Sequence, residues 1–294
     1  MWTIPFMTHR RKSLPLVFIV ACPRSGTTLL QSLLASHSEI ISFPETKFFE
    51  KAFPRKEPSR KFLGLVSRQL YPQLQSFFIN DLKRPDIAKQ LPKDGSHSWY
   101  TTFFFNLLSE IAQEQGKKIV LEKTPEHINH LKTIDECLPQ AKVIHVVRNG
   151  PDVVASLYAL AHSTPSIWNE FQDLEVCLER WINKTKRSFM KTRNKANHVL
   201  VRYEHLTQDP QQEIQKLCNF LNINFEHTML ENYGVVSHSL CREHEYWKQK
   251  VADPIKRQRY TQFDRALTEE QKSFVLDSIE KAGLSNTYIS PLAE

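Results

Sequence analysis

A strand, a short loop and a helix follow one another between Leu16 and His37, in the stretch LVFIVACPRSGTTLLQSLLASH. The run Leu16–Ala21 is β-branched and aromatic, as a central parallel strand requires. From Thr27 onward, leucines recur on one face of a helix. Gly26 allows the tight turn between them. This order constrains the fold most, because it predicts an α/β chain with an anion site where the helix begins.

Further strands and helices alternate along the chain. Three more apolar runs predict strands, at Ile119–Leu121, Val143–Val147 and His198–Val201. Helical patterns are expected in three further places: from Phe171 to Phe189, after Asp209-Pro210, and over about Thr268–Lys281. The alternation predicts the fold class α/β, with a P-loop-like three-layer α/β/α architecture, a central parallel β-sheet and a single domain over residues 1–294.

Ligands of such sheets lie beyond the carboxyl ends of the strands. This rule puts three segments on one rim, namely Cys22–Thr28, Glu122–Pro125 and Arg148–Gly150. Two stretches have weaker periodicity and are expected to be loops and lids: Gln90–Ser98 and Ser237–Arg265. Within the second, HEYWKQK around Trp247 is a candidate lid.

The 294 residues carry a formal net charge of +7, which suits nucleic acid, an anionic membrane or an anionic small molecule. The basic residues are spread along the chain, so we expect no nucleic acid and no membrane partner. Five cysteines without a C-x-x-C pair indicate reduced thiols in a cytoplasmic protein. Basic residues before the apolar run imitate a signal peptide, but cleavage before Cys22 would remove the first strand, so we expect no targeting segment.

The loop differs from a nucleotide-hydrolysing P-loop at one decisive position. In the frame G-x-x-x-x-G-K-[ST], Thr27 stands where the lysine belongs and Thr28 takes the last position. The N–H groups at the helix start and the hydroxyls of Ser25, Thr27 and Thr28 can still cradle an anion. Arg24 can supply the missing charge. A plain junction whose hydroxyls cap the helix is the structural alternative.

The stretch CPRSGTTLL resembles the 5′-phosphosulfate loop of sulfotransferases that use 3′-phosphoadenylyl sulfate (PAPS). It is most similar to the bacterial branch that shares its loop with tyrosylprotein sulfotransferases, and the likeness covers about residues 15–50, 117–160 and 196–222. The resemblance implies that PAPS donates its sulfuryl group to a hydroxyl or amine of a small-molecule acceptor and leaves as adenosine 3′,5′-bisphosphate. It implies that the phosphosulfate is held by Arg24, Ser25, Gly26, Thr27 and Thr28.

The stretch VIHVVRNGPDVVASL contains a second expected anion site. Arg148 ends a predicted strand and Ser156 lies about two turns into the next helix, so both can reach one phosphate. The family uses this arginine and serine for the 3′-phosphate of PAPS, although Arg148 alone would also suit an ion pair with Asp152. The resemblance suggests that Tyr203 lies near the adenine, unless it is a core tyrosine. We therefore expect two separate pockets along one margin of the sheet.

Proton transfer from the acceptor needs a base. The candidate is Glu45, in SFPETKFF, whose phenylalanine neighbours would raise the pKa of the carboxylate by burial. The family has its proposed catalytic base at this distance after the loop arginine. Lys123 is implied to contact the transferring group, with a salt bridge to Glu122 or Glu126 as the alternative. His127 stays open as a second candidate base.

The sulfuryl group carries less negative charge than a phosphoryl group. Arg24, Lys123 and the N–H groups of the helix terminus are therefore expected to suffice as catalytic donors without a metal ion. Cytosolic relatives cover the nucleotide with a C-terminal Arg-Lys-Gly motif that is absent here. Four basic residues stand in a similar place and either cover the nucleotide in part or form a solvated face: Lys256, Arg257, Arg259 and Arg265.

An aromatic cluster at Trp99, Tyr100 and Phe103–Phe105 either lines an acceptor pocket or belongs to the core. Two other functions stay open. A P-loop kinase or NTPase would need a lysine at Thr27 and a strand-end carboxylate for Mg²⁺. A non-catalytic nucleotide-binding module would bind PAPS without turnover.

Overall fold

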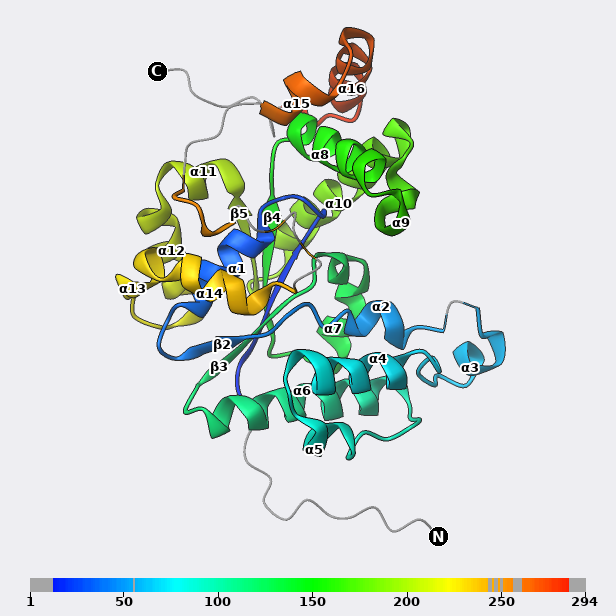
Figure 1. Ribbon diagram of the computed structural model, residues 1–294, viewed down its shortest axis with the longest axis vertical. Helices are drawn as coiled ribbons and strands as arrows, with labels where there is room; N and C mark the ends of the chain where they lie inside the picture. The colour runs from blue at the N-terminus through cyan, green and yellow to red at the C-terminus, as the bar shows by residue number, and fades with distance from the viewer. Residues whose placement is uncertain are drawn as a thin grey trace.

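The computed structural model describes residues 13–54, 56–242, 245, 248, 251–255 and 261–285. Five parallel strands form one sheet in the order β2-β3-β1-β4-β5 (Figure 1). The strands are β1 (Leu16–Ala21), β2 (Ile40–Ser42), β3 (Ile119–Lys123), β4 (Lys142–Val147) and β5 (His198–Arg202). Four match the predicted strands. The short edge strand β2 was not predicted.

Helices cover both faces of the sheet, as the three-layer prediction requires (Figure 1). The first half of the chain contributes α1 (Thr27–Ala35), α2 (Phe48–Ala52), α3 (Pro58–Phe62), α4 (Leu70–Ser76), α5 (Pro85–Ala88), α6 (His97–Glu114) and α7 (Leu131–Cys137). The second half contributes α8 (Gly150–Ser163), α9 (Pro165–Trp168), α10 (Leu174–Asn194), α11 (Tyr203–Gln208), α12 (Pro210–Leu221), α13 (Thr228–Glu231), α14 (Tyr233–Leu240), α15 (Thr261–Ala266) and α16 (Glu269–Lys281). A π-helix spans Phe77–Asp81, and 3₁₀ helices span Pro125–His130 and Asn169–Phe171.

The central strand β1 is buried on both faces. Phe18 and Val20 pack into a core built with α2, α4 and α6, whereas Val17, Ile19 and Ala21 pack on the opposite side with α1 and α12. Successive side chains point to opposite faces of a sheet, so a strand covered by helices on both sides must be apolar throughout. This burial explains the unbroken apolar run in the sequence.

The ends of the predicted helices agree with the structure where a side-chain cap fixes them. Asp209 caps α12 by accepting a hydrogen bond from the Gln212 N–H, and Thr268 and Gln271 form a capping box at α16. The helix predicted from Phe171 begins later, at Leu174, because Asp173 caps it. The prediction that 237–265 is a loop is partly wrong, since α14 continues to Leu240 and α15 begins at Thr261.

Within the described residues, no helix combines the length and the hydropathy needed to cross a bilayer.

The register of the sheet brings the candidate site together. Ile19 of β1 pairs with Lys123 of β3, and Ala21 pairs with Val146 of β4. Because all strands are parallel, the P-loop after β1, the end of β3 and Arg148 after β4 meet at one edge.

Candidate active site

The loop after β1 has the backbone geometry of an anion cradle. Arg24 and Gly26 adopt left-handed conformations, with φ of 70° and 86°. Gly26 is the N-cap of α1, and no side chain of the described residues caps that helix start. The first N–H groups of α1 therefore keep their hydrogen-bonding capacity for a ligand.

Four of the five predicted phosphosulfate residues line one cavity and the fifth does not. Arg24, Gly26, Thr27 and Thr28 line a cavity of about 960 Å³. Ser25 is buried beneath it, and its Oγ has no hydrogen-bond partner among the described residues. A buried hydroxyl without a partner costs free energy, so a phosphosulfate oxygen next to this loop would fit the residues present.

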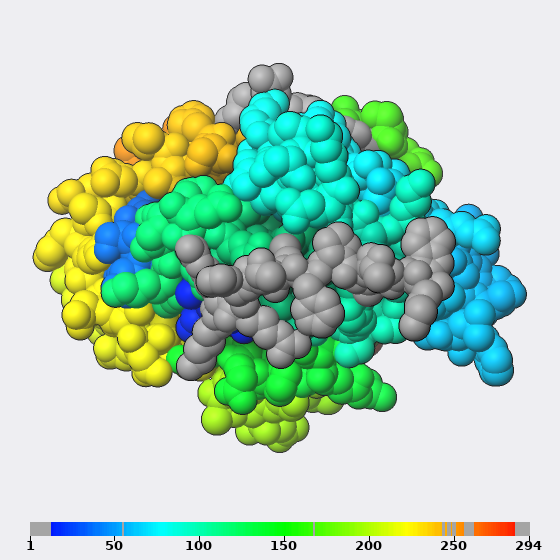
Figure 2. Space-filling view, turned by 90° about the horizontal axis from the view of Figure 1, so that it is seen from below, coloured from blue at the N-terminus to red at the C-terminus, as the bar shows by residue number. Residues whose placement is uncertain are grey.

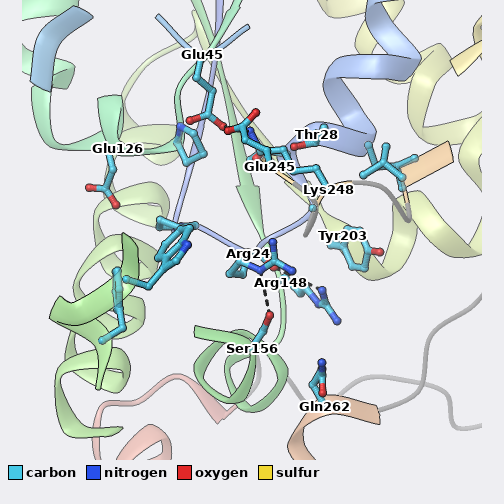
Figure 3. A pocket seen from close by; sticks show the side chains of 18 of the residues that line it. Arg24, Thr28, Glu45, Glu126, Arg148, Ser156, Tyr203, Glu245, Lys248 and Gln262 are labelled. Carbon is cyan, nitrogen blue, oxygen red and sulfur yellow. Dashed lines mark hydrogen bonds and ion pairs between the residues drawn. The ribbon is translucent and has the colours of Figure 1, made fainter. Parts of the chain in front are cut away.

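The second predicted anion site adjoins the first. The Nε of Arg24 donates to Ser156 Oγ at 3.1 Å, and both residues line the same cavity as Arg148 (Figure 3). The expectation of two separate pockets is therefore wrong. The loop after β1 and the first turns of α8 are adjacent at the carboxyl ends of the strands, so both expected anion sites lie in one continuous cavity.

Arg148 forms the ion pair with Asp152 that was the structural alternative. Its Nη2 lies 3.0 Å from Asp152 Oδ2, and Asn149 caps α8 by accepting from the Asp152 N–H. The guanidinium also stacks over the Tyr203 ring, 4.7 Å from its centroid. Arg148 still lines the cavity, so the ion pair and the ring orient a cation that a phosphate can contact.

Tyr203 packs directly on the loop glycine. A Cβ built on Gly26 would lie 2.2 Å from Cδ2 of the Tyr203 ring. The ring is thus held between the loop and the Arg148 guanidinium, and it lines the cavity. Its expected position near the adenine remains a prediction.

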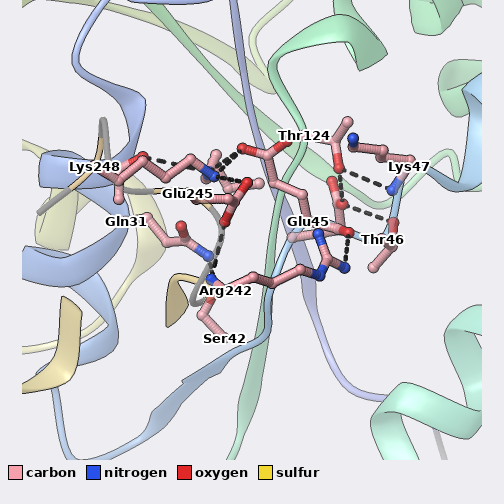
Figure 4. Close-up of polar contacts among 12 residues, drawn as sticks. Gln31, Ser42, Glu45, Thr46, Lys47, Thr124, Arg242, Glu245 and Lys248 are labelled. Atoms are coloured by element: carbon pink, nitrogen blue, oxygen red, sulfur yellow. Dashed lines mark hydrogen bonds and ion pairs between the residues drawn. The ribbon is translucent and has the colours of Figure 1, made fainter. Parts of the chain in front are cut away.

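Glu45 lies between two lysines rather than in an apolar shell. Its Oε1 is 2.5 Å from Lys123 Nζ and 2.9 Å from Lys248 Nζ, and Lys248 also contacts Glu245 Oε1 at 2.6 Å (Figure 4). Burial alone would raise the pKa of Glu45, but the charges and hydrogen bonds of the two lysines outweigh burial and hold it well below its usual range. The expected rise in this pKa is therefore wrong, because the two lysines outweigh the effect of burial. Phe48 and Phe49 pack into the core.

Lys123 connects the candidate base with the P-loop. It is 1% exposed, and its Nζ lies 3.4 Å from Thr28 Oγ1 as well as 2.5 Å from Glu45 Oε1. Burial lowers the pKa of Lys123, although Glu45 opposes the shift. The alternative partners are engaged elsewhere, because Glu122 accepts from Thr46 and Glu126 pairs with Lys184.

His127 is fully buried and does not line the cavity. Its Nε2 accepts from the Phe49 N–H at 3.3 Å, so Nδ1 carries the proton and donates to Glu122 Oε2 at 2.9 Å. Both ring nitrogens are thus occupied by structural hydrogen bonds. These contacts leave Glu45 as the better placed of the two candidate bases.

The C-terminal part of the chain closes the cavity. Of the four basic residues predicted here, Arg265 lines the cavity, while Lys256, Arg257 and Arg259 lie outside the described residues. Glu245 and Lys248 were not singled out, although they belong to the stretch HEYWKQK. Trp247 also lies outside the described residues.

The predicted aromatic cluster on α6 belongs mainly to the core. Tyr100, Phe104 and Phe105 are buried, and Phe104 stacks on Phe48. None of them lines the cavity. The aromatic residues that line it instead include Trp168 and Phe171, in the α9 region. Among the described residues, no group of three or more His, Cys, Asp or Glu side chains is arranged to hold a metal ion.

Several known proteins are similar to this chain. An uncharacterized protein of Aquifex aeolicus is 22% identical over 289 residues, which is 95% of this chain and 32% of that protein. Protein-tyrosine sulfotransferase 1 of Danio rerio is 23% identical over 235 residues, 79% of this chain and 59% of the relative. This chain thus spans about a third of the length of the Aquifex aeolicus protein and less than two thirds of the length of the Danio rerio protein.

The sulfotransferase domain from the Synechococcus PCC 7002 olefin synthase has a similar fold, with a TM-score of 0.58 and 22% identity over 95% of this chain and 98% of that domain. Residues 15–227 match the model of a family described as the sulfotransferase family. That match includes β1 to β5 and the whole P-loop. The chain therefore belongs to the sulfotransferase family.

Proposed function

We propose that the protein transfers the sulfuryl group of PAPS to a hydroxyl of a small-molecule acceptor and releases adenosine 3′,5′-bisphosphate. One observation carries the proposal: Arg24, Arg148 and the uncapped start of α1 line the same cavity as Glu45. The cations and N–H groups suit a donor with two anionic ends. The carboxylate suits removal of a proton from the acceptor.

The proposed reaction is a single in-line displacement. The acceptor oxygen attacks sulfur, its proton passes to Glu45, and the S–O bond to the 5′-phosphate breaks, so the electron pair stays on the leaving phosphate. Lys123, between Glu45 and Thr28, is placed to stabilise charge near the loop. An amine acceptor would react in the same way.

Binding of the donor is assigned to Arg24, Ser25, Gly26, Thr27 and Thr28 for the 5′ end, and to Arg148, Ser156 and Tyr203 for the rest of the nucleotide. We propose that Arg24 and Lys123 supply the charge that a metal ion supplies in phosphoryl transfer. Activity that persists in EDTA is the expected result. A kinase is less well supported, because Thr27 replaces the P-loop lysine and the neighbouring rim residues are Lys123 and Arg148.

Sulfur-35 PAPS tests the proposal directly. The wild-type protein and Glu45→Gln are incubated with labelled PAPS and a panel of phenols, alcohols and amines, and parallel samples contain ATP and Mg²⁺. We expect label in an acceptor with the wild-type protein, a decrease of about 10²–10⁴-fold in Glu45→Gln, and an unchanged affinity for adenosine 3′,5′-bisphosphate. Consumption of ATP in place of PAPS, or PAPS binding without turnover across the panel, would overturn the proposal.

A further inference from the structure

The closing segment follows α14, and its described residues include Cys241, Arg242, Glu245 and Lys248. It contributes to the cavity wall and contacts the loop of the candidate base at two points. Arg242 contacts both carboxylate oxygens of Asp81, with the shortest distance 2.6 Å, and donates to the backbone carbonyl of Glu45 at 2.9 Å. Lys248 contacts the Glu45 carboxylate from the same segment. The Glu45 backbone and side chain are therefore both held by residues that lie about 200 positions later in the chain.

Lys248 is built into a buried network of alternating charges. Lys123 and Lys248 both contact Oε1 of Glu45, and Lys248 also contacts Glu245 (Figure 4). Only 9% of the Lys248 side chain and 13% of the Glu45 side chain are exposed. Two positive and two negative charges balance one another, which makes the burial of each one tolerable.

The geometry separates the two oxygens of the candidate base. Both lysines donate to Oε1, whereas no hydrogen bond from the described residues reaches Oε2, so Oε2 can take the proton of an acceptor. Lys123 holds Oε1 from the strand beneath and Lys248 from the closing segment. Removal of either cation would let the carboxylate rotate and would favour its neutral form.

We propose that Lys248 is a positioning residue for the transfer reaction, which orients the Glu45 carboxylate and keeps it ionised so that it can accept a proton. This inference rests on the proposed function. Glu245 in turn positions Lys248. In this role Lys248 acts through Glu45.

The charged and titratable groups around Glu45 come from three elements. Lys123 is on β3 and Glu50 is on α2, while Cys241, Arg242, Glu245 and Lys248 belong to the closing segment. Among the described residues of that segment, Lys248 is the cation in contact with the Glu45 carboxylate. Its loss therefore raises the pKa of Glu45, and activity should then fall as the pH drops.

Lys248→Met keeps most of the length of the side chain and removes its charge. We expect the acid limb of its kcat–pH profile to shift upward by at least about one pH unit, so the ratio of its kcat to that of the wild type should fall as the pH drops below about 5, toward the ordinary glutamate pKa of about 4.3. Lys248→Arg should restore the wild-type pH profile in large part. The affinity for adenosine 3′,5′-bisphosphate should stay the same in all variants, because the donor end of the cavity is untouched.

Lys184→Met is the matched control. Lys184 is also a buried lysine in an ion pair with a cavity carboxylate, Glu126. A purely structural loss would lower kcat equally at every pH in both variants. If Lys248→Met is too unstable to measure, Lys248→Met/Glu245→Gln removes one charge of each sign and should move the profile in the same direction. A pH profile that is unchanged in Lys248→Met, or shifted equally in Lys184→Met, would overturn the inference.

A measurement that needs no turnover separates this inference from the proposed function. The carboxyl carbon of Glu45 can be titrated by ¹³C NMR and assigned by its absence in Glu45→Gln. A higher pKa in Lys248→Met than in the wild type supports the inference even if no acceptor is found. An equal pKa in both proteins refutes it even if the wild type transfers sulfate.

Discussion

The guanidinium of Arg24 and the hydroxyl of Ser156 are joined by a 3.1 Å hydrogen bond across 132 positions of sequence. The bond connects the P-loop with the second turn of α8. It orients a loop arginine whose backbone is left-handed and whose side chain lines the cavity. The burial of Arg24 lowers the pKa of its guanidinium to about 10, assisted by the charge of Arg148. Two cations this close favour a ligand with more than one negative charge.

Ser156→Ala should weaken the binding of adenosine 3′,5′-bisphosphate by roughly tenfold, because a hydrogen bond to a charged group contributes about 1.5–3 kcal/mol and water replaces part of it. Isothermal titration calorimetry measures the change. Ser163→Ala on the same helix is the control, since the Ser163 hydroxyl bonds to Leu160 and Thr164 at the opposite end of α8 from Asn149. Equal affinities in the two variants would contradict a role for Ser156.

Arg148→Ala should weaken donor binding more than Ser156→Ala, by roughly 10–100-fold, because it removes a whole charge from the cavity. The same change leaves Asp152 buried without its cation, so the melting temperature should also fall. Arg84→Ala is the control, because Arg84 pairs with Asp86 and Glu114 outside the cavity. An unchanged dissociation constant in Arg148→Ala would remove Arg148 from the binding site.

Gly26→Ala should abolish donor binding and destabilise the fold, because the new methyl group would lie 2.2 Å from the Tyr203 ring. Gly116→Ala is a matched control. Gly116 has a similar φ of 68° but nothing within 4 Å of an added Cβ. Gly116→Ala therefore isolates the backbone strain, about 1–3 kcal/mol. Equal losses of unfolding free energy in urea would show that the Tyr203 contact is unimportant.

His127→Gln should lower the stability of the protein without removing its chemistry. The substitution weakens the hydrogen bonds to the Phe49 N–H and Glu122, at a cost of about 1–3 kcal/mol of unfolding free energy. Thermal melts and sulfuryl transfer at a temperature where the variant is folded give the two readouts. A variant that is as stable as the wild type yet inactive would restore His127 as the base.

The burial of His145 predicts that the folded protein loses stability in mild acid. It is buried between Ser188 and His198, and this burial lowers its pKa from 6.5 to about 3. The unfolded chain binds a proton near pH 6.5 that the folded chain refuses, so the free energy of unfolding falls as the pH drops below 6.5. The slope from this residue is about 1.4 kcal/mol per pH unit.

Urea titrations between pH 7 and pH 5 should therefore show a smaller decrease in stability for His145→Gln than for the wild type. His162→Gln, at an exposed position on α8, is the control and should follow the wild-type slope. Identical slopes in all three proteins would exclude His145 as the source.

The sequence predicted the parts of the fold that depend on local pattern. β1, β3 and β4 are buried strands and β5 is a partly buried edge strand, and each contains an apolar run. The capped starts of α12 and α16 have recognisable side chains. β2 was not predicted because three residues are too few to show a periodic pattern. It is a strand only because β3 lies beside it.

The sequence predicted which residues belong to the candidate site, but it did not predict which of them contact one another. Strand ends in a parallel sheet must meet at one edge, so the rim residues could be named in advance. Contacts between distant segments could not. The environment of Glu45 depends on Lys248, 203 positions away, and the phenylalanines next to Glu45 in sequence turn toward the core. The residues next to Glu45 in the sequence thus predicted a raised pKa, whereas the two lysines lower it.

The cavity wall beyond residue 227, where the family match ends, includes Glu245, Lys248 and Arg265. The strand-end rim, with the P-loop and Arg148, lies entirely before it. Glu245, Lys248 and Arg265 thus reach the cavity from a part of the chain whose described residues contribute no strand to the sheet. Substitutions among them can alter the wall of the cavity without disturbing the register that brings the strand ends together.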